Sequence, residues 1–439
     1  MALRSHHFSV NTQMATLLAI NNYYYYRGGA ETLFFEHNRI FEASGWKVVP
    51  FSMKHQRNFE TPWSKYFIDE IEFGQRYSIP EQLVRVPKVI YSVEARRNLG
   101  RLLDEVQPDV CHAHNIYNHI SPSILGLLKG RGIPTVLTLH DLKIACPAYN
   151  MLAPDGICER CRGGRLYNVL VHRCVKGSAA LSAVMMIEAV LHRMLGSYRH
   201  CVSRFAVPSR FYIDKLSEWG MPASLFRHVP NFVDADRYRP EYRPGAMFVY
   251  FGRISREKGL ATLIRAAAAA RCQLTVIGSG PDLADMRRLA SEVEADVIFP
   301  GFLSGDALHE IVRLARAVVV PSEWYENAPM TVLEAYALGK PVIGARIGGI
   351  PELIRENDTG VSFVSGDQNS LCAVLRDMIQ RSDADLEQMG RRARRWVETE
   401  FTALLYRDRI LEIYRELGVR VAGVPSWSNK RATRSSNEA

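Results

Sequence analysis

Short apolar segments alternate with longer helix-forming segments, and this pattern occurs twice along the chain. It limits the fold more than any other feature. The apolar segments are residues 13–20, 47–52, 109–113, 134–139 and 204–208, then 246–252, 273–278, 297–300, 317–321 and 341–345. They do not alternate strictly between apolar and polar residues, which is typical of parallel strands covered on both faces. The sequence therefore predicts an α/β protein with two Rossmann-like, doubly wound domains that face each other across a cleft.

The helical segments between these strands complete the two series. We expect helices at residues 29–44, 89–106, 120–129, 182–195, 259–270, 282–291, 306–313, 331–338, 383–398 and 403–417. A proline-rich stretch, with Pro230, Pro240 and Pro244, separates the two series. We expect an N-terminal domain over 13–230, a C-terminal domain over 231–398, a helix at 399–418 that packs back on the N-terminal domain, and a disordered tail at 419–439. The first dozen residues are expected to be disordered as well.

Composition places the chain among ordinary globular proteins. Of its 439 residues, 47% are hydrophobic and 23% are charged, which excludes disordered, collagen-like, coiled-coil and disulfide-scaffold classes. Its apolar-looking stretch at 177–187 is far shorter than the roughly 20 residues that cross a bilayer. The apolar part of the N-terminus is also too short for a signal peptide. We therefore expect a cytoplasmic protein whose eight cysteines are reduced.

Two glutamates bracket the start of one predicted helix. Glu326 lies in the loop before it, and Glu334 lies about one and a half turns inside it. Pro329 stands at an early helical position, and Gly339 ends the helix, with Pro341 two residues later. The free backbone N–H groups of the first turn point into the space between the two carboxylates. This arrangement predicts a site for phosphate and for sugar hydroxyls.

Two cations are expected at the same edge of the sheet. Arg253 follows a predicted strand, and Lys258 precedes the next helix. Ligands of open α/β sheets bind at the carboxyl ends of the strands. A guanidinium together with an ammonium can hold a diphosphate, although two solvated cations in a loop are the simpler alternative.

Taken together, these motifs resemble the large GT-B family of retaining glycosyltransferases, family 4, over residues 14–417. The resemblance rests on Gly28-Gly29, Leu139-His140-Asp141, the G-R-x4-K-G element at 252–259, Gly278-Ser-Gly280-Pro281, the E-x7-E pair at 326–334 and the Gly348-Gly349 loop. It implies that residues 13–230 form the acceptor side and residues 231–398 bind the nucleotide sugar. It also implies transfer of a sugar from a uridine or guanosine diphosphate sugar to a hydroxyl of a glycan or lipid-linked acceptor, with retention of configuration, as in bacterial polysaccharide or glycolipid synthesis.

The resemblance also implies roles for single residues. The backbone of Gly28 and Gly29 would approach the distal phosphate, where a Cβ would obstruct. Arg253 and Lys258 would neutralise the diphosphate. Stabilising that leaving group would be the main contribution to catalysis. The further expected members of the donor site are Glu334 at the ribose, Glu326 at the sugar hydroxyls, Phe302 near the nucleobase, and the backbone of Asn327, Ala328, Pro329, Met330 and Thr331 around the sugar and phosphates.

His140 would lie at the reaction centre, opposite the donor domain; a packed histidine at a strand end is its alternative role. We do not assign Glu326 as a covalent nucleophile. No cofactor is expected for catalysis. The two D-x-D matches, at 234–236 and 383–385, fall in a linker and at a helix start, where caps or solvated loops are the expected roles.

Four cysteines form a group after His140. Cys146 and Cys174 lie 12 and 13 positions from the nearer cysteine of the pair Cys158-x2-Cys161, a spacing typical of a four-thiolate zinc site. A structural zinc ion could order this loop, while reduced surface thiols or a redox disulfide are the alternatives. Cys111, Cys201, Cys272 and Cys372 are isolated and are expected to fill the core.

The basic stretch at 160–204 carries eight basic residues and one acidic residue and contains a partly apolar helix. One hypothesis is that it meets an anionic membrane, peripherally at the inner face, or a lipid-linked acceptor. The other is that its apolar residues face the core.

Competing functions are disfavoured. The net charge of +9 comes without a nucleic-acid-binding module, so no nucleic acid partner is expected. The three-glycine fingerprint of a nicotinamide dehydrogenase is absent after the first strand. A non-catalytic sugar-nucleotide binder would be expected to lack His140, Glu326 or Arg253, and all three are present.

Overall fold

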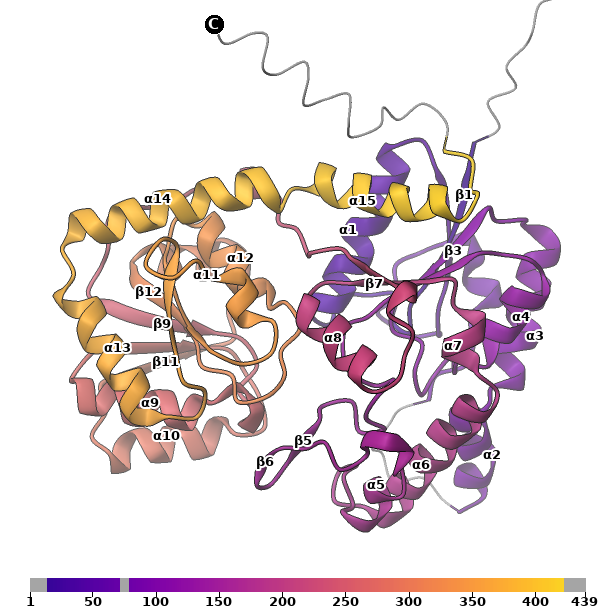
Figure 1. Cartoon of the computed structure of the whole chain (residues 1–439), viewed down its shortest axis with the longest axis horizontal. Helices are drawn as coiled ribbons and strands as arrows, with labels where there is room; N and C mark the ends of the chain where they lie inside the picture. The colour runs from indigo at the N-terminus through magenta and orange to yellow at the C-terminus, as the bar shows by residue number, and fades with distance from the viewer. Residues whose placement is uncertain (1–13, 72–78, 422–439) are drawn as a thin grey trace, which may run out of the picture. The chain divides into compact units, whose positions relative to one another are not determined.

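The computed structural model describes residues 14–71 and 79–421 (Figure 1). Most of the tail expected to be disordered, and the first dozen residues, lie outside the described residues. The chain divides into two compact units. Met1–Thr138, His200–Arg204 and Arg407–Ala439 form the first unit, as far as they are described, and Leu139–Arg199 and Phe205–Tyr406 form the second.

Each series of strands forms a six-stranded sheet. The first sheet has the order β2 (Lys47–Phe51), β1 (Thr16–Ile20), β3 (Val110–Ala113), β4 (Thr135–Thr138), β7 (Arg204–Val207) and β8 (Phe226–His228). The pairs β1–β2, β1–β3, β3–β4 and β7–β8 run parallel. The helices of this part are α1 (Gly29–Ala43), α2 (Ile79–Ile90), α3 (Val93–Glu105), α4 (Ser123–Gly130) and α8 (Arg210–Glu218).

The second sheet is parallel throughout. Its order is β11 (Val297–Gly301), β10 (Leu274–Ile277), β9 (Met247–Phe251), β12 (Ala315–Val320), β13 (Val342–Ala345) and β14 (Gly360–Phe363). Its helices are α9 (Leu260–Ala270), α10 (Leu283–Glu292), α11 (Gly305–Arg313), α12 (Met330–Ala337), α13 (Gln368–Gln380) and α14 (Asp383–Glu400). The predicted α/β fold with two doubly wound sheets is confirmed.

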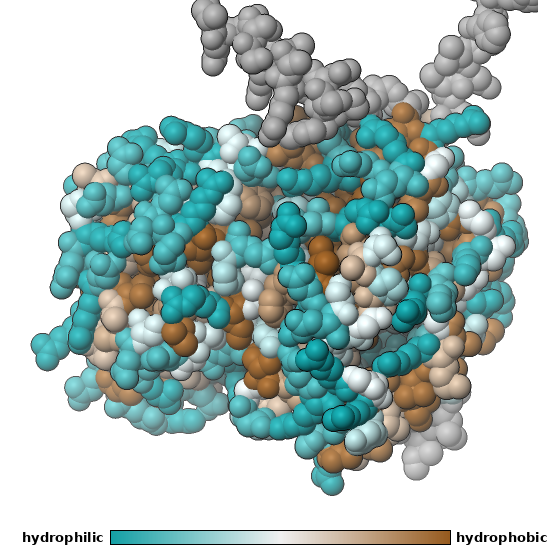
Figure 2. Space-filling view, in the orientation of Figure 1, coloured by the Kyte–Doolittle hydropathy of each residue, from teal (hydrophilic) through white to brown (hydrophobic). Residues whose placement is uncertain are grey.

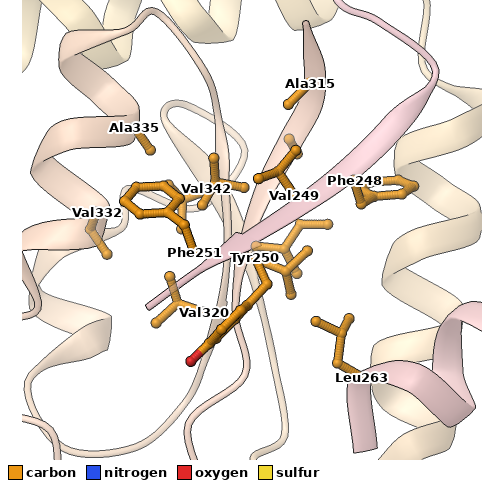
Figure 3. Packing of buried hydrophobic residues seen from close by; sticks show 14 of the residues in the cluster. Phe248, Val249, Tyr250, Phe251, Leu263, Ala315, Val320, Val332, Ala335 and Val342 are labelled. Atoms are coloured by element: carbon orange, nitrogen blue, oxygen red, sulfur yellow. The ribbon is translucent and has the colours of Figure 1, made fainter. Parts of the chain in front are cut away.

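The core of the second sheet is centred on β9, which is buried on both faces (Figure 3). Figure 3 shows Phe251 directed toward Val332 and Ala335 of α12, with Leu263 of α9 on the other side of the strand. Alternate side chains of a strand point to opposite faces, so both helix layers pack on the same five residues. Burying each large apolar side chain contributes about 1.5–3 kcal/mol, which holds the strand ends in place.

The structure corrects one predicted helix. Residues 89–106 do not form a single helix, because α2 ends at Ile90 and α3 begins at Val93. The Ser92 hydroxyl accepts a hydrogen bond from the Ala95 N–H at 3.0 Å and caps α3. The helices α8 and α13 and the short strands β8 and β14 had not been predicted.

The segment after β4 has little regular structure near its start. It contains the two-residue strands β5 (Leu152–Ala153) and β6 (Gly156–Ile157), then α5 (Asn168–Val171), α6 (Ala179–Met194) and α7 (Ser197–Cys201). Within the described part of the chain, no helix combines the length and apolar character that crossing a bilayer requires.

The last helix, α15 (Ala403–Glu416), contributes to the core of the first unit. Tyr414 is fully buried, and its ring lies 5.5 Å from that of Phe41 and 5.7 Å from that of Trp46. Its hydroxyl lies 2.7 Å from Nδ1 of His112. The end of the described chain therefore packs into the unit that the first strands build.

Candidate donor site

The residues predicted to bind the donor follow the strands of the second sheet. Arg253 follows β9, Phe302 follows β11, and Glu326 lies between β12 and α12. Since the strands are parallel, their carboxyl ends meet at one edge of the sheet, where open α/β sheets bind ligands. Sequence order alone therefore places these residues at the same edge.

Glu326 is buried beside a cation and a hydroxyl. Its Oε1 lies 2.6 Å from Nζ of Lys258 and accepts a hydrogen bond from the Ser322 hydroxyl at 2.7 Å. Burial alone would raise the pKa of Glu326, but Lys258, with Trp324 and Ser322, outweighs it and holds the pKa below its usual range. Glu326 is therefore ionised at neutral pH, and Lys258 already has a carboxylate partner.

Glu334 has the opposite environment. It lies half-buried in α12, and burial raises the pKa of its carboxyl to about 7. Near neutral pH, a small change in its surroundings can therefore change its charge. The two glutamates of the E-x7-E pair, which look equivalent in sequence, differ in charge.

The N-terminus of α12 lies between the two glutamates along the chain. Pro329 precedes the first helical residue, Met330, and the Val332 N–H donates to the carbonyl of Pro329 at 3.1 Å. Ala328 is buried, whereas Met330 and Thr331 are half-buried. The first N–H groups of a helix have no partner within it, so this end of α12 suits an anion.

Arg253 and Phe302 are both exposed. The backbone carbonyl of Arg253 accepts a hydrogen bond from the Tyr250 hydroxyl at 2.6 Å, which anchors the turn beneath the guanidinium. Phe302 is 71% exposed, an unusual state for a phenylalanine at a strand end. An exposed aromatic ring of this kind can stack on a planar base.

The Asn327 side chain serves a structural purpose. Its Oδ1 accepts a hydrogen bond from the Ser209 hydroxyl at 2.8 Å, and its Nδ2 donates to the carbonyl of Leu139 at 2.8 Å. These bonds tie the residue next to Glu326 to the residue before His140, all within the second unit. Only the backbone of Asn327 is left to face a ligand.

His140 is half-buried at the start of the segment that follows β4. Burial lowers the pKa of its imidazole to about 4, so the ring is neutral at physiological pH. Burial also raises the pKa of Asp141 to about 6, with Lys143 opposing the shift. The Asp141 carboxylate accepts a hydrogen bond from the Lys143 N–H at 2.9 Å, which shapes the turn after His140.

The glycines of the second half allow loops to touch. A Cβ on Gly278 would lie 1.9 Å from the carbonyl oxygen of Gly252, and one on Gly280 would lie 2.0 Å from that of Ile254. A Cβ on Gly349 would lie 1.9 Å from the carbonyl oxygen of Asn327. Gly278-Ser-Gly280 therefore packs the loops of the site against one another.

Gly28 and Gly29 lie in the first unit, at the start of α1, and both are exposed. A Cβ on Gly28 would meet only Oε2 of Glu31, at an ordinary 3.7 Å. Within its own unit, Gly28 is therefore not required by packing, and its approach to a phosphate stays a prediction.

Ser322, Tyr325 and Glu159 were not predicted to belong to this region. Ser322 bonds Glu326, and the Tyr325 hydroxyl donates to Oε1 of Glu159 at 3.0 Å. Of these three residues, only Ser322 could have been predicted from the sequence, because it follows the end of a strand and precedes Glu326 by four residues. The partnership of Tyr325 and Glu159 joins residues 166 positions apart, and no local pattern predicts it.

The D-x-D matches have structural partners. Asp234 pairs with Arg237 at 2.9 Å, and the Asp385 N–H donates to the Ser382 hydroxyl that caps α14.

Two family models match the chain and together extend from residue 27 to residue 396. The model described as Glycosyltransferase Family 4 matches residues 27–237, and the one described as Glycosyl transferases group 1 matches residues 236–396. The junction between them falls in the proline-rich stretch.

The chain resembles several characterised glycosyltransferases. It is 28% identical over 192 residues to the alpha-D-kanosaminyltransferase of Streptomyces kanamyceticus, a match of 42% of this chain and 48% of that protein. It is 30% identical over 242 residues to the sulfoquinovosyl transferase SQD2 of Arabidopsis thaliana, a match that covers 50% of this chain and 47% of that protein. These matches span about half the length of those relatives. For the D-inositol 3-phosphate glycosyltransferase of Pseudarthrobacter chlorophenolicus, identity is 27% over 343 residues, 73% of each protein.

Solved structures share the fold over nearly the whole chain. Sucrose-phosphate synthase from Thermosynechococcus elongatus matches with a TM-score of 0.68 and 20% identity, over 92% of this chain and 99% of that one. Anabaena Alr3699/HepE in complex with UDP-glucose matches with a TM-score of 0.62 and 16% identity, over 92% of this chain and 100% of that one. At such identities the likeness concerns the fold alone, which is GT-B.

Proposed function

Since the chain belongs to the group 1, family 4 glycosyltransferases of GT-B fold, we propose that it transfers a sugar from a nucleoside diphosphate sugar to an acceptor hydroxyl, with retention of configuration. The observation that carries the proposal is the pair of half-buried Lys258 with buried Glu326, 2.6 Å apart, and Glu326 stands a few residues before the N-terminus of α12. A cation, a carboxylate and free backbone N–H groups together suit a diphosphate linked to a polyol.

The donor is held by groups of different kinds. Arg253 and Lys258 face the diphosphate, the carboxylate of Glu334 accepts hydrogen bonds from ribose hydroxyls, and Phe302 stacks on the base. Glu326 accepts hydrogen bonds from the sugar. We propose a uridine or guanosine diphosphate as carrier; a solved structure of the same fold, Anabaena Alr3699/HepE, contains UDP-glucose.

Catalysis then consists mainly of stabilising the departing diphosphate. The bond between sugar C1 and the diphosphate oxygen breaks, and the acceptor oxygen bonds to C1 on the same face. The acceptor proton passes to a diphosphate oxygen. Fixed cations and helix N–H groups favour the growing negative charge without reorganising. His140, being neutral, can donate a hydrogen bond to a sugar hydroxyl without adding charge.

For the acceptor we propose an anionic or lipid-linked molecule that meets the segment over α5 and α6. Several large apolar side chains there are exposed, among them Tyr167, Val171, Ile187, Met194 and Leu195. Figure 2 shows hydrophobic surface among hydrophilic surface over the region that Figure 1 labels α5 and α6. Apolar groups beside arginines suit a membrane surface that carries anionic headgroups.

A cavity of ≈ 130 Å³ lies next to this surface. Its lining includes Arg193, Arg199 and the buried pair Lys143–Glu188, whose Nζ and Oε2 atoms are 3.0 Å apart. A cavity of this size, with cations in its wall, suits an anionic headgroup.

The donor assignment is tested by thermal shift with UDP, GDP and their sugars. One nucleotide should stabilise the wild type and the control Arg288→Ala, an exposed arginine on α10, but not Arg253→Ala or Glu334→Ala. No stabilisation of the wild type by any nucleotide would refute the donor site. NMR of the sugar released by slow donor hydrolysis tests retention, and an inverted anomer would contradict it.

The acceptor surface is tested by sedimentation with liposomes. Binding to anionic vesicles should exceed binding to neutral ones and should weaken in Met194→Glu, but not in the control Leu314→Glu, which changes an exposed apolar residue outside this segment. Equal binding to both vesicle types, or none, would refute the membrane proposal and leave the donor site untouched.

A further inference from the structure

Four of the eight cysteines lie around one small cavity. Cys146, Cys158, Cys161 and Cys174 line a space of ≈ 10 Å³ in the second unit, together with Asn168 and His172. Residues spread over 29 positions of sequence thus bring four sulfurs to one place.

The segment that carries these cysteines has few other means of holding its shape. Between Cys146 and Cys174 the regular structure is limited to two strands of two residues, a three-residue 3-10 turn and a four-residue helix. Tyr149, Met151 and Arg173 have left-handed backbone conformations, with φ of 62°, 48° and 46°. Such conformations cost about 1 kcal/mol or more each, so the loop requires a cross-link or dense packing.

A second group of potential ligands has another explanation. In the described residues, the group whose ligand atoms all lie within 4.8 Å is His37, His112 and His114, all buried. Both ring nitrogens of His112 are engaged, with the Tyr414 hydroxyl and the Thr138 hydroxyl at 2.7 Å each. The three rings pack against one another with centroids 4.3–5.6 Å apart, as core aromatics do.

The four sulfurs are spaced more widely than this histidine group. Thiolates of one zinc ion lie about 3.8 Å apart, since each Zn–S bond is about 2.3 Å. Rotation about χ1 from one staggered position to another moves a cysteine sulfur by a few ångströms, with no change in the backbone. Such rotations can therefore bring the four sulfurs to the spacing of a zinc site. All four cysteines are free thiols in the structure, so none is committed to a disulfide.

We propose that Cys146, Cys158, Cys161 and Cys174 bind one Zn²⁺ as four thiolates, releasing their protons to solvent, and that this structural site fixes the position of Glu159. Glu159 stands between two of the ligands in sequence. Its Oε1 accepts hydrogen bonds from Lys215 Nζ at 2.8 Å and from the Tyr325 hydroxyl at 3.0 Å.

Through Tyr325 the cysteine site reaches the donor loop. Tyr325 is the neighbour of Glu326, and its carbonyl accepts a hydrogen bond from the Tyr212 hydroxyl at 3.0 Å. A second contact joins the same regions, because the Arg256 guanidinium donates to the Pro154 carbonyl. Glu159 therefore acts as a positioning residue for the loop that contains Glu326, and this role of Glu159 rests on the proposed function.

Zinc content of the purified full chain, without a histidine tag, is the first test. Elemental analysis should find one zinc ion per chain. The variant Cys158→Ser/Cys161→Ser should lose it, and the control Cys272→Ser/Cys372→Ser should keep it. If the first variant does not fold, Co²⁺ added to wild type stripped of metal should give the intense visible absorption of a tetrahedral thiolate site.

Two results would overturn the metal proposal: a wild type free of zinc that also gives no such Co²⁺ spectrum, or a Cys158–Cys161 disulfide in protein purified anaerobically. Glu159→Gln tests the positioning role. It should keep its zinc and raise the donor KM several-fold with little change in kcat; an unchanged KM would refute that role. Zinc is measured without nucleotide, so failure of the metal site and failure of the donor site are distinguishable.

Discussion

Three ionisable side chains of the candidate site carry different charges because their surroundings differ. Lys258 and Ser322 keep buried Glu326 ionised, burial leaves Glu334 near its midpoint at neutral pH, and burial keeps His140 neutral. The site therefore combines one fixed negative charge, one adjustable carboxyl and one neutral imidazole. Their charges, more than their identities, determine what each can do for a substrate.

Glu334 should make nucleotide binding depend on pH. Its pKa of about 7 means that the carboxylate needed by the ribose hydroxyls forms as pH rises from about 6 to 8, so affinity should increase over that range. Glu334→Gln should bind about 10- to 100-fold more weakly, as expected for a lost charged hydrogen bond, and its affinity should be flat with pH. Calorimetric titration at several pH values measures this; a variant with the wild-type slope would contradict it.

The Glu334 carboxyl should affect folding stability in the opposite direction: a rise in pH that favours nucleotide binding should lower the free energy of unfolding. The pKa of Glu334 is raised in the folded state above its value of about 4.3 in the unfolded chain. Between these values the unfolded state binds fewer protons, so the free energy of unfolding should fall as pH rises from about 4.3 to 7. Without nucleotide, Glu334→Gln should lack this part of the decline in denaturant titrations.

The Lys258–Glu326 pair should show strong coupling. Removing Lys258 alone leaves a buried carboxylate without its cation, so Lys258→Met should cost more stability than Lys258→Met/Glu326→Gln. A double-mutant cycle by denaturant unfolding should give a coupling energy of about 1–3 kcal/mol. A value near zero would mean that the pair contributes nothing before the donor binds.

At the scale of elements, parallel strands place the loops and close backbone contacts hold the loops together. The carboxyl ends of β9, β10, β11 and β12 share one edge, so four loops meet there. Glycines at their contacts permit this, because carbonyl oxygens of one loop occupy the space that a Cβ of the next would need. The loop network is therefore rigid for a steric reason.

Gly280→Ala should be severely destabilising. Its Cβ would lie 2.0 Å from the Ile254 carbonyl oxygen, so backbone must move, at a cost of about 3 kcal/mol or more. The matched control is Gly130→Ala at the end of α4, where no atom lies within 4 Å of the added Cβ, and its stability should be almost unchanged. Thermal or urea unfolding of both variants compares them, and equal stability would contradict the steric account.

At the scale of the whole molecule, the chain passes between its two units several times. Residues from Arg407 to the end of the described chain belong to the first unit, although the predicted donor residues from Arg253 to Glu334 belong to the second. Tyr414 therefore completes a core that begins with β1 and α1, and it does so from the far end of the described chain.

Removing Tyr414 should weaken the first unit without affecting the donor residues. Tyr414→Ala deletes a fully buried ring and should cost about 3–5 kcal/mol, whereas Tyr414→Phe only leaves His112 Nδ1 without its hydroxyl partner and should cost about 1–3 kcal/mol. Urea unfolding measures the loss. Nucleotide affinity in both variants should equal that of the wild type, and a parallel loss of affinity would contradict this separation.

The sequence by itself determined the order of most strands and helices, because apolar periodicity, caps and prolines act over a few residues, but it did not reveal α8, α13, β8 or β14. It also predicted that Arg253 and Lys258 belong to the same edge as the Glu326–Glu334 pair, since ligands of parallel sheets bind at the carboxyl ends of the strands, whereas the place of Phe302 came from the family resemblance. The break between α2 and α3 was missed because a single serine cap interrupts an otherwise continuous helical pattern.

Only the tertiary structure decided the chemistry of these groups. Lys258 pairs with Glu326 across 68 residues, Asn327 is tied to Leu139 across 188, and Glu334 has a raised pKa because surrounding elements bury it. Charge, burial and hydrogen-bond partners depend on contacts between residues far apart in sequence, which no local pattern contains. The chain's own order of residues placed the groups at the site, and the packing around them determined their protonation and their partners.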